Sequence, residues 1–185
     1  NWNIDAIYSC SQKGLSCPPG ASPISFSEKA LNKMKQRKNL PPNWYLDMSE
    51  IIKYWDGSQR VYHHTAPINM MYALYQSLFD LLEEGIDETL LRHYNAHLLL
   101  EEGLNELGLE LLVDKECRLP SLNAIIIPDG IDDILIRNKL LNDYHIEIGG
   151  GLGPFAGKVW RVGLMGYSAK PVNVKQLLNA FKEIL

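Results

Sequence analysis

Residues 8–21 of this chain read Tyr-Ser-Cys-Ser-Gln-Lys-Gly-Leu-Ser-Cys-Pro-Pro-Gly-Ala, which places one lysine, Lys13, between an apolar run and a turn. The apolar run at residues 6–8 predicts a strand, and Pro18-Pro19-Gly20 predicts a sharp break after the lysine. A fixed strand followed by a turn can present an amine at a cleft. Such an amine can form a Schiff base with a carbonyl compound. On spacing alone, the alternative is an exposed lysine that merely ends a strand.

Two distant segments accompany the lysine region. Residues 62–67 read YHHTAP, and residues 149–154 read GGGLGP and are followed by GKVWRVGLMG at 157–166. Together with Ser-Gln-Lys-Gly-Leu-x-x-Pro-Pro-Gly at residues 11–20, these segments resemble, in the same order, the motifs of the class V pyridoxal-phosphate aminotransferases. Within that family the likeness is to the alanine–glyoxylate and serine–pyruvate aminotransferases. It extends over essentially all 185 residues.

The resemblance implies an α/β fold, namely the C-terminal part of a fold type I aminotransferase. It places the end of the large cofactor-binding domain, with a dimer-contact helix, in residues 1–85 and a small C-terminal α/β domain in residues 86–185. The chain begins at Asn1 without a methionine, and its motifs match the C-terminal half of the family. We therefore expect about half of a typical member upstream. That half would carry the groups that stack on the cofactor ring and pair with its pyridine nitrogen.

The same resemblance implies a cofactor, pyridoxal 5'-phosphate, and a role for five residues. Lys13 would bind the cofactor covalently and move a proton during transamination. Gln12 would contact the cofactor phosphate, as would Tyr62 and Thr65 from the neighbouring subunit of a homodimer, because neutral donors suit a phosphate dianion. Arg161 would grip the substrate carboxylate with two nitrogens, which a guanidinium does better than an ammonium. No metal is expected.

These roles have structural alternatives. Residues 62–65 could be a polar surface loop. The adjacent His63 and His64 are expected to chelate a metal poorly, because neighbouring side chains of an extended chain point in different directions. Arg161 could form a salt bridge with a glutamate such as Glu147, because an arginine within an apolar strand needs a partner.

Other motifs are weaker. The glycine loop at 149–154 does not follow the dinucleotide-binding pattern, and we interpret it as a close-approach loop that positions Arg161, with glycine allowing positive φ. His93 and His97 share one face of a predicted helix, but Tyr94 stands where a zinc protease has glutamate, so a solvated face is expected. Two acidic pairs are expected to be ordinary exposed side chains: Glu101-Glu102 and Asp132-Asp133.

Composition narrows the function classes. The net charge of −4 argues against a general nucleic-acid surface. No apolar stretch approaches the roughly 20 residues that cross a membrane. An odd number of cysteines, three, without CxxC spacing indicates reduced thiols and a cytoplasmic location, and we expect small packing roles for them. The C-terminal residues are not a peroxisomal Ser-Lys-Leu signal.

Periodicity and turn residues predict alternating helices and strands. In chain order they are strands near 5–9 and 23–26, helices over 28–37 and 49–55, a turn at 56–58, helices over 68–85 and 87–107, strands over 109–113 and 123–127, a helix over 131–144, strands over 146–148 and 159–164, and a helix over 171–184. In the helix over 131–144 the inward residues are expected to be Ile134, Leu135, Leu140 and Leu141. Gly85 is the predicted domain boundary.

Two classes of function follow. The first is an aminotransferase that moves an amino group from a small amino acid, alanine or serine, to a small 2-oxo acid, glyoxylate or pyruvate. A 3-hydroxykynurenine transaminase belongs to the same branch. The second is a non-catalytic dimerising or structural fragment that lacks the other half of the cofactor site. A cysteine desulfurase of the same fold is disfavoured, because that group typically has His-Lys where this chain has Gln12-Lys13.

Overall fold

The computed structural model describes residues 2–55 and 61–185, and the predicted turn at 56–58 lies outside them. The described chain divides into two compact units. The first comprises residues 1–12 and 17–76, and the second comprises residues 13–16 and 77–185. The chain passes from the first unit to the second within helix α3 (Ile68–Glu84). The domain boundary at Gly85 stays a prediction.

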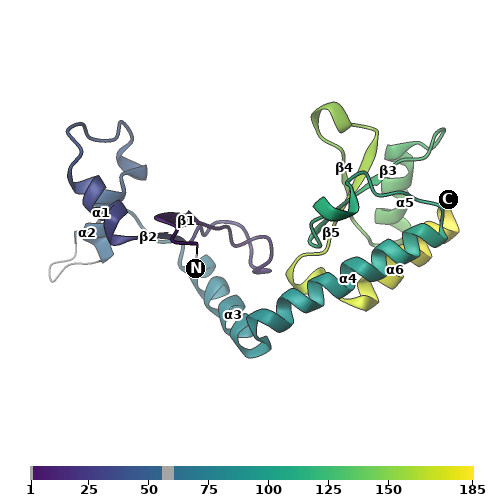
Figure 1. Ribbon diagram of the computed structural model, residues 1–185, viewed down its shortest axis with the longest axis horizontal. Helices are drawn as coiled ribbons and strands as arrows, with labels where there is room; N and C mark the ends of the chain where they lie inside the picture. Colours follow the sequence, from purple (N-terminus) through teal and green to yellow (C-terminus); the bar gives the residue numbers. More distant parts are fainter. Residues whose placement is uncertain (1, 56–60) are drawn as a thin grey trace. The chain divides into compact units, whose positions relative to one another are not determined.

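The first unit contains a two-stranded antiparallel sheet and short helices (Figure 1). Strand β1 (Ala6–Tyr8) pairs with β2 (Ile24–Phe26), so that Ala6 lies opposite Phe26. Ser27 begins α1 (Glu28–Lys35) as its N-cap, because its hydroxyl accepts a hydrogen bond from the Ala30 N–H at 3.2 Å. The remaining elements are the 3-10 helix η1 (Trp44–Leu46) and the helix α2 (Met48–Trp55).

The second unit is built on a three-stranded antiparallel sheet with strand order β3-β5-β4. Long helices α4 and α6 run side by side along this sheet (Figure 1). Its elements in chain order are α4 (Ile86–Glu106), η2 (Lys115–Cys117), β3 (Leu122–Ile126), α5 (Asp133–Tyr144), β4 (Gly149–Gly150), η3 (Gly153–Phe155), β5 (Val159–Gly163), η4 (Gly166–Ser168) and α6 (Pro171–Ile184). The predicted α/β class is confirmed.

The core of the second unit lies between one face of this sheet and its helices. Trp160 of β5 stacks on Phe181 of α6, with ring centroids 5.4 Å apart. Alternate residues of a strand point to opposite faces of the sheet, so Arg161 lies on the face opposite to the core. The largest fully buried side chains of this unit are Trp160, Phe181, Leu100, Leu104, Ile125, Leu140 and Val174.

Two predicted strands are wrong, and helix ends explain one of them. The predicted strand at 146–148 does not form, because the N–H of Ile146 caps α5 by donating to the carbonyl of Leu140 at 2.9 Å. Pairing with β5 begins only at Gly149. The segment predicted as a strand at 109–113 makes a single bridge, Leu111 to Ile125.

The predicted inward face of α5 is correct at Leu140 and wrong at its other three residues. Ile136 and Leu140 are buried, whereas Ile134, Leu135 and Leu141 are exposed. No helix among residues 2–55 and 61–185 is both long enough and apolar enough to cross a membrane.

Candidate active site

The lysine region is a loop with a closed base. The backbone N–H of Cys17 donates to the carbonyl of Ser11 at 3.0 Å, and the Ser11 hydroxyl donates to the carbonyl of Pro18 at 2.7 Å. Ser11 and Cys17 are buried. Ser11 and Cys17 therefore close the base of the loop, and Cys17 has the packing role expected of it.

Lys13 lies at the tip of this loop, in a tight turn at residues 13–16 that belongs to the second unit. The N–H of Ser16 donates to the carbonyl of Lys13 at 2.9 Å, and Ser16 adopts a left-handed conformation with φ of 56°. The hydroxyl of Ser77 donates to the carbonyl of Leu15. Both Lys13 and its neighbour Gln12 are exposed. This exposure fits a presented amine and also the alternative of an exposed lysine that ends a strand.

The segment at residues 62–65 brings two hydroxyls together. The Tyr62 and Thr65 hydroxyl oxygens are 2.6 Å apart, and both side chains are exposed. His63, by contrast, is buried: its ring stacks on Trp44 at a centroid distance of 3.9 Å, and its Nε2 lies 3.1 Å from the Trp44 carbonyl oxygen. The buried histidine thus fixes the backbone between two neutral donors that a phosphate group could bind.

The rings of His63 and His64 lie within hydrogen-bond distance of each other. Their Nδ1 atoms are 2.7 Å apart. Across the described residues, no group of three or more His, Cys, Asp and Glu side chains could hold a metal ion.

Arg161 lies on the central strand β5 with small residues on both sides. Its partners in register are Ala124 on β3 and Gly149 on β4. A Cβ atom at Gly149 would lie 3.1 Å from the Nη2 atom of Arg161. Arg161 Nε donates to the carbonyl of Gly150 at 2.7 Å, so the backbone of β4 holds the half-buried guanidinium in place.

The terminal nitrogens of Arg161 remain available. Among the described residues, Arg161 forms no ion pair with Glu147 or another carboxylate, and its two Nη atoms have no hydrogen-bond partner. A guanidinium held by Nε with both Nη atoms available can bind a carboxylate with two parallel hydrogen bonds.

Most glycines of residues 149–154 are needed because neighbouring atoms lie close to their Cα atoms, and not because of unusual backbone dihedrals. A Cβ at Gly151 would overlap the carbonyl oxygen of Phe155, so only glycine fits there. Gly153 is the one with a positive φ, 54°. The interpretation of a loop that positions Arg161 is therefore consistent with the contacts of both Gly149 and Gly150.

The two histidines of α4 are not on a solvated face, which corrects the prediction. His97 is buried, and its Nδ1 lies 2.6 Å from Asn123 Oδ1. His93 is half-buried and bonded on both ring nitrogens, to the Thr89 carbonyl and to the Gly166 N–H. Their spacing of four residues indicated a shared face, but only the fold shows that strand β3 and the η4 turn cover it.

One member of each acidic pair differs from the prediction of exposed acids, whereas Glu102 and Asp132 are exposed as predicted. Glu101 Oε1 accepts from Arg118 Nη1 at 2.5 Å, and the Glu101 side chain is only 14% exposed. Asp133 accepts hydrogen bonds from Trp160 Nε1 at 3.1 Å and from Arg137 Nε at 2.7 Å. Arg118 and Trp160 lie 17 and 27 positions along the chain from their acids, so local sequence does not reveal them.

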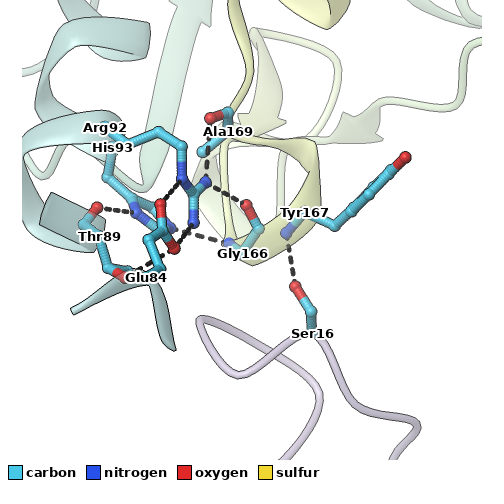
Figure 2. A network of polar contacts seen from close by, with 8 residues as sticks. All are labelled: Ser16, Glu84, Thr89, Arg92, His93, Gly166, Tyr167 and Ala169. Atoms are coloured by element: carbon cyan, nitrogen blue, oxygen red, sulfur yellow. Dashed lines mark hydrogen bonds and ion pairs between the residues drawn. The ribbon is translucent and has the colours of Figure 1, made fainter. Parts of the chain in front are cut away.

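A network that the sequence did not predict joins α4 to the segment after β5 (Figure 2). Arg92 donates to Glu84 through Nε at 2.5 Å and through Nη2 at 2.8 Å. Its Nη1 donates to the carbonyls of Gly166 and Ala169 at 2.7 and 3.1 Å. The hydrogen bonds from Arg92 lower the pKa of the Glu84 carboxyl from 4.5 to about 2.

The predicted site residues are distributed over both units. Gln12, Tyr62 and Thr65 belong to the first unit, and Lys13 and Arg161 belong to the second. The structure brings Tyr62 and Thr65 into direct contact. The first unit offers a pair of neutral hydroxyl donors, which suit a phosphate group. The second unit offers an exposed amine and a guanidinium with available Nη atoms, which suit a carbonyl compound and a carboxylate.

Known proteins resemble the chain over its whole length, although no protein-family model matches it. It is 43% identical over 185 residues to the alanine–glyoxylate aminotransferase of Felis catus, a match that covers 98% of this chain and 45% of that protein. The crystal structure of an alanine–glyoxylate aminotransferase from Nostoc sp. matches with a TM-score of 0.93 and 50% identity, over 98% of this chain and 48% of the other.

A third match is the crystal structure of a ureidoglycine–glyoxylate aminotransferase from Bacillus subtilis. Its TM-score is 0.95 at 37% identity, and the match covers 100% of this chain and 47% of that one. The chain therefore spans about half the length of the curated relatives it matches, as expected from motifs that fit only half of a family member.

Proposed function

Because this chain belongs to the class V aminotransferases, we propose that the protein containing it moves an amino group from a small amino acid to a small 2-oxo acid with pyridoxal 5'-phosphate. The observation that carries the proposal is the combination of the exposed Lys13 amine at a fixed turn with the available Nη atoms of Arg161. One group suits a carbonyl cofactor, and the other suits the substrate carboxylate.

Glyoxylate is the acceptor that we favour. The cat and Nostoc proteins and the Bacillus subtilis protein are named for different amino donors, alanine and ureidoglycine, but all are named for glyoxylate. Alanine or serine is the donor that we favour for this protein, with pyruvate as the second acceptor to test.

The residues divide the work by their chemistry. When bound, pyridoxal phosphate would supply the carbonyl and the electron-accepting ring that transamination needs. The Nζ atom of Lys13 would hold the cofactor and would carry the proton that leaves the substrate α-carbon. The hydroxyls of Tyr62 and Thr65 and the amide of Gln12 would donate to its phosphate. The guanidinium of Arg161 would orient the substrate through its carboxylate.

We further propose a two-fold homodimer in which Tyr62 and Thr65 serve the neighbouring subunit's cofactor. Helix α3 supports a partner there, because several of its large side chains are exposed although apolar or aromatic. They are Tyr72, Tyr75, Phe79 and Leu82.

Isotope transfer tests the reaction directly. The full-length holoenzyme is incubated with [15N]alanine or [15N]serine and glyoxylate, and [15N]glycine is measured by mass spectrometry. We expect labelled glycine from at least one donor, no labelled glycine from Lys13→Ala, and unchanged transfer in Lys158→Ala. Lys158 is the matched control, because it is an exposed lysine of the second unit with no role in the proposed chemistry.

The alternative is a non-catalytic dimerising or structural protein, which the half-length match keeps open as a second candidate. It predicts no labelled glycine with either donor, and a protein that stays colourless when pyridoxal phosphate is added. Either donor giving label excludes it.

A further inference from the structure

His93 forms hydrogen bonds through both of its ring nitrogens in this structure. Its Nδ1 lies 2.7 Å from the Thr89 carbonyl oxygen, and its Nε2 accepts the Gly166 N–H at 2.8 Å. A carbonyl oxygen can only accept and a backbone N–H can only donate. In this arrangement Nδ1 donates to the Thr89 carbonyl and Nε2 accepts through its lone pair.

Arg92, the preceding residue, holds the same turn from the other side. His93 Nε2 accepts a hydrogen bond from the Gly166 N–H, and Arg92 Nη1 donates to the carbonyl oxygens of Gly166 and Ala169 (Figure 2). Gly166 is buried. Two consecutive side chains of α4 thus fasten the η4 turn at its N–H and at two of its carbonyls.

The η4 turn in turn contacts the lysine loop. The N–H of Tyr167 donates to the Ser16 hydroxyl oxygen at 2.5 Å, and a Cβ atom at Gly166 would overlap that hydroxyl. Ser16 also closes the lysine turn by donating its N–H to the Lys13 carbonyl at 2.9 Å. A continuous path of hydrogen bonds and peptide units therefore runs from His93 through the η4 turn to Lys13.

We propose that His93 is a positioning residue for Lys13: its unprotonated Nε2 anchors the η4 turn that holds Ser16 and thereby the lysine turn. Without an acceptor at this position the Gly166 N–H loses its partner, and the lysine turn loosens. The link from this anchor to the cofactor rests on the proposed function, in which Lys13 is the cofactor lysine.

Two substitutions test the acceptor. His93→Gln places an amide oxygen, which accepts hydrogen bonds, within reach of the Nε2 position. His93→Leu fills similar space but accepts nothing. The matched control is His97→Gln, a change on the same helix at a histidine that bonds Asn123 and not the η4 turn.

Hydrogen exchange of the full-length protein without cofactor measures the anchor itself. Exchange rates of peptides that contain residues 13–17 and 163–169 are recorded at pH 8 and corrected for intrinsic exchange. We expect both peptides to exchange about tenfold faster in His93→Leu than in the wild type, the scale of one lost hydrogen bond. His93→Gln, which keeps an acceptor, and His97→Gln, which leaves the η4 turn untouched, should both exchange at the wild-type rate.

Kinetics of the holoenzyme give the second readout. His93→Leu should lower kcat with little change in KM for the amino acid, because Arg161 still binds the carboxylate, and His93→Gln should restore kcat. Exchange at residues 13–17 that is the same in wild type and His93→Leu overturns the proposal, and this comparison holds even if His93→Gln does not fold.

The two proposals fail separately. The exchange experiment uses no cofactor, so it reports on the anchor whether or not Lys13 is the cofactor lysine. If Lys13 is not that lysine, the isotope transfer experiment fails while the exchange coupling persists.

Discussion

The Nη atoms of Arg161 are available because its neighbours in the sheet are small. Ala124 and Gly149 flank it in the sheet, and the Gly150 carbonyl takes only its Nε. Arg161→Lys keeps the charge but loses the planar pair of Nη donors. We expect a rise in KM for the amino acid equivalent to about 1.5–3 kcal/mol, the range for a hydrogen bond to a charged group, with the melting temperature unchanged. Steady-state kinetics and thermal unfolding of the holoenzyme measure the two quantities.

Arg137→Lys is the contrasting variant. Arg137 forms an ion pair with Asp133 at 2.7 Å within α5, so its change should affect stability and leave KM unchanged. A loss of stability with unchanged KM in Arg161→Lys would instead identify Arg161 as a structural residue.

Glu84 links the network on α4 to acid stability. The hydrogen bonds from Arg92 lower its pKa from 4.5 to about 2. A lowered pKa in the folded state means that the stabilisation is fully present above pH 4.5 and is lost as the pH falls toward 2. Because a third of the Glu84 side chain is exposed, we expect only about 1 kcal/mol in the free energy of unfolding.

The difference in unfolding free energy between wild type and Glu84→Gln checks this. It should be constant at neutral pH and shrink through the window from pH 4.5 to 2. Glu83→Gln, at the exposed neighbouring position, should show no such dependence. A Glu84→Gln difference that persists unchanged at pH 2 would falsify the role of the ion pair.

Residue-scale sequence reasoning succeeded where a side chain acts with its chain neighbours and failed where a distant segment supplies the partner. The exposed lysine turn and the Arg161 contact with the glycine loop follow from local sequence. The burial of His93 and His97 depends on residues 166 and 123, which lie more than 20 positions away. The roles of Lys13, Gln12, Tyr62, Thr65 and Arg161 remain predictions.

At the scale of elements, helices α4 and α6 pack through a glycine. A Cβ at Gly103 would overlap Leu178 Cδ1 and lie 2.8 Å from its Cδ2. Replacing glycine by alanine within a helix ordinarily stabilises by about 1 kcal/mol. Here we expect Gly103→Ala to destabilise the protein by about 1–3 kcal/mol through overpacking.

A double-mutant cycle with Leu178→Ala measures the coupling. The combined variant should recover stability relative to the sum of the two single changes, because alanine at 178 leaves room for the new methyl group. Strictly additive free energies of unfolding would mean that Gly103 and Leu178 do not constrain the packing of the two helices.

The elements themselves were predictable where their ends carry local signals. Pro171 begins α6 and Ser27 caps α1, and both starts agree with the structure. The strand predicted at 146–148 failed because its first N–H is used to end α5. His145 allows this cap by adopting a left-handed conformation with φ of 57°. Glycine is the residue type that usually signals such a helix end, and histidine does not.

At the scale of the whole molecule, the proposed dimer makes each active site depend on two chains. A Lys13→Ala chain coexpressed with a Tyr62→Phe, Thr65→Ala chain, both full length, should form mixed dimers. By two-fold symmetry one site then holds both defects and the other holds neither, so about half the activity per mixed dimer should return. Activity of purified mixed dimers, selected with two affinity tags, measures it.

The same experiment has a clear contrary result. If residues 62–65 serve their own subunit, every site in a mixed dimer keeps one defect and no activity returns. A fully active monomer in sedimentation would also contradict the shared site.

The family and the α/β class were predictable from three ordered motifs, and the comparisons agree with both. The two units divide at residues 76 and 77, inside the continuous helix α3, and the domain boundary at Gly85 stays a prediction.

Covalent trapping of the cofactor tests the central proposal most directly. The full-length holoenzyme is reduced with borohydride and digested, and the pyridoxyl-modified peptide is identified by mass spectrometry. We predict a single adduct on Lys13, in the loop closed by Ser11 and Cys17. An adduct on another lysine, such as Lys29, Lys35 or Lys158, with Lys13 unmodified, would contradict the account.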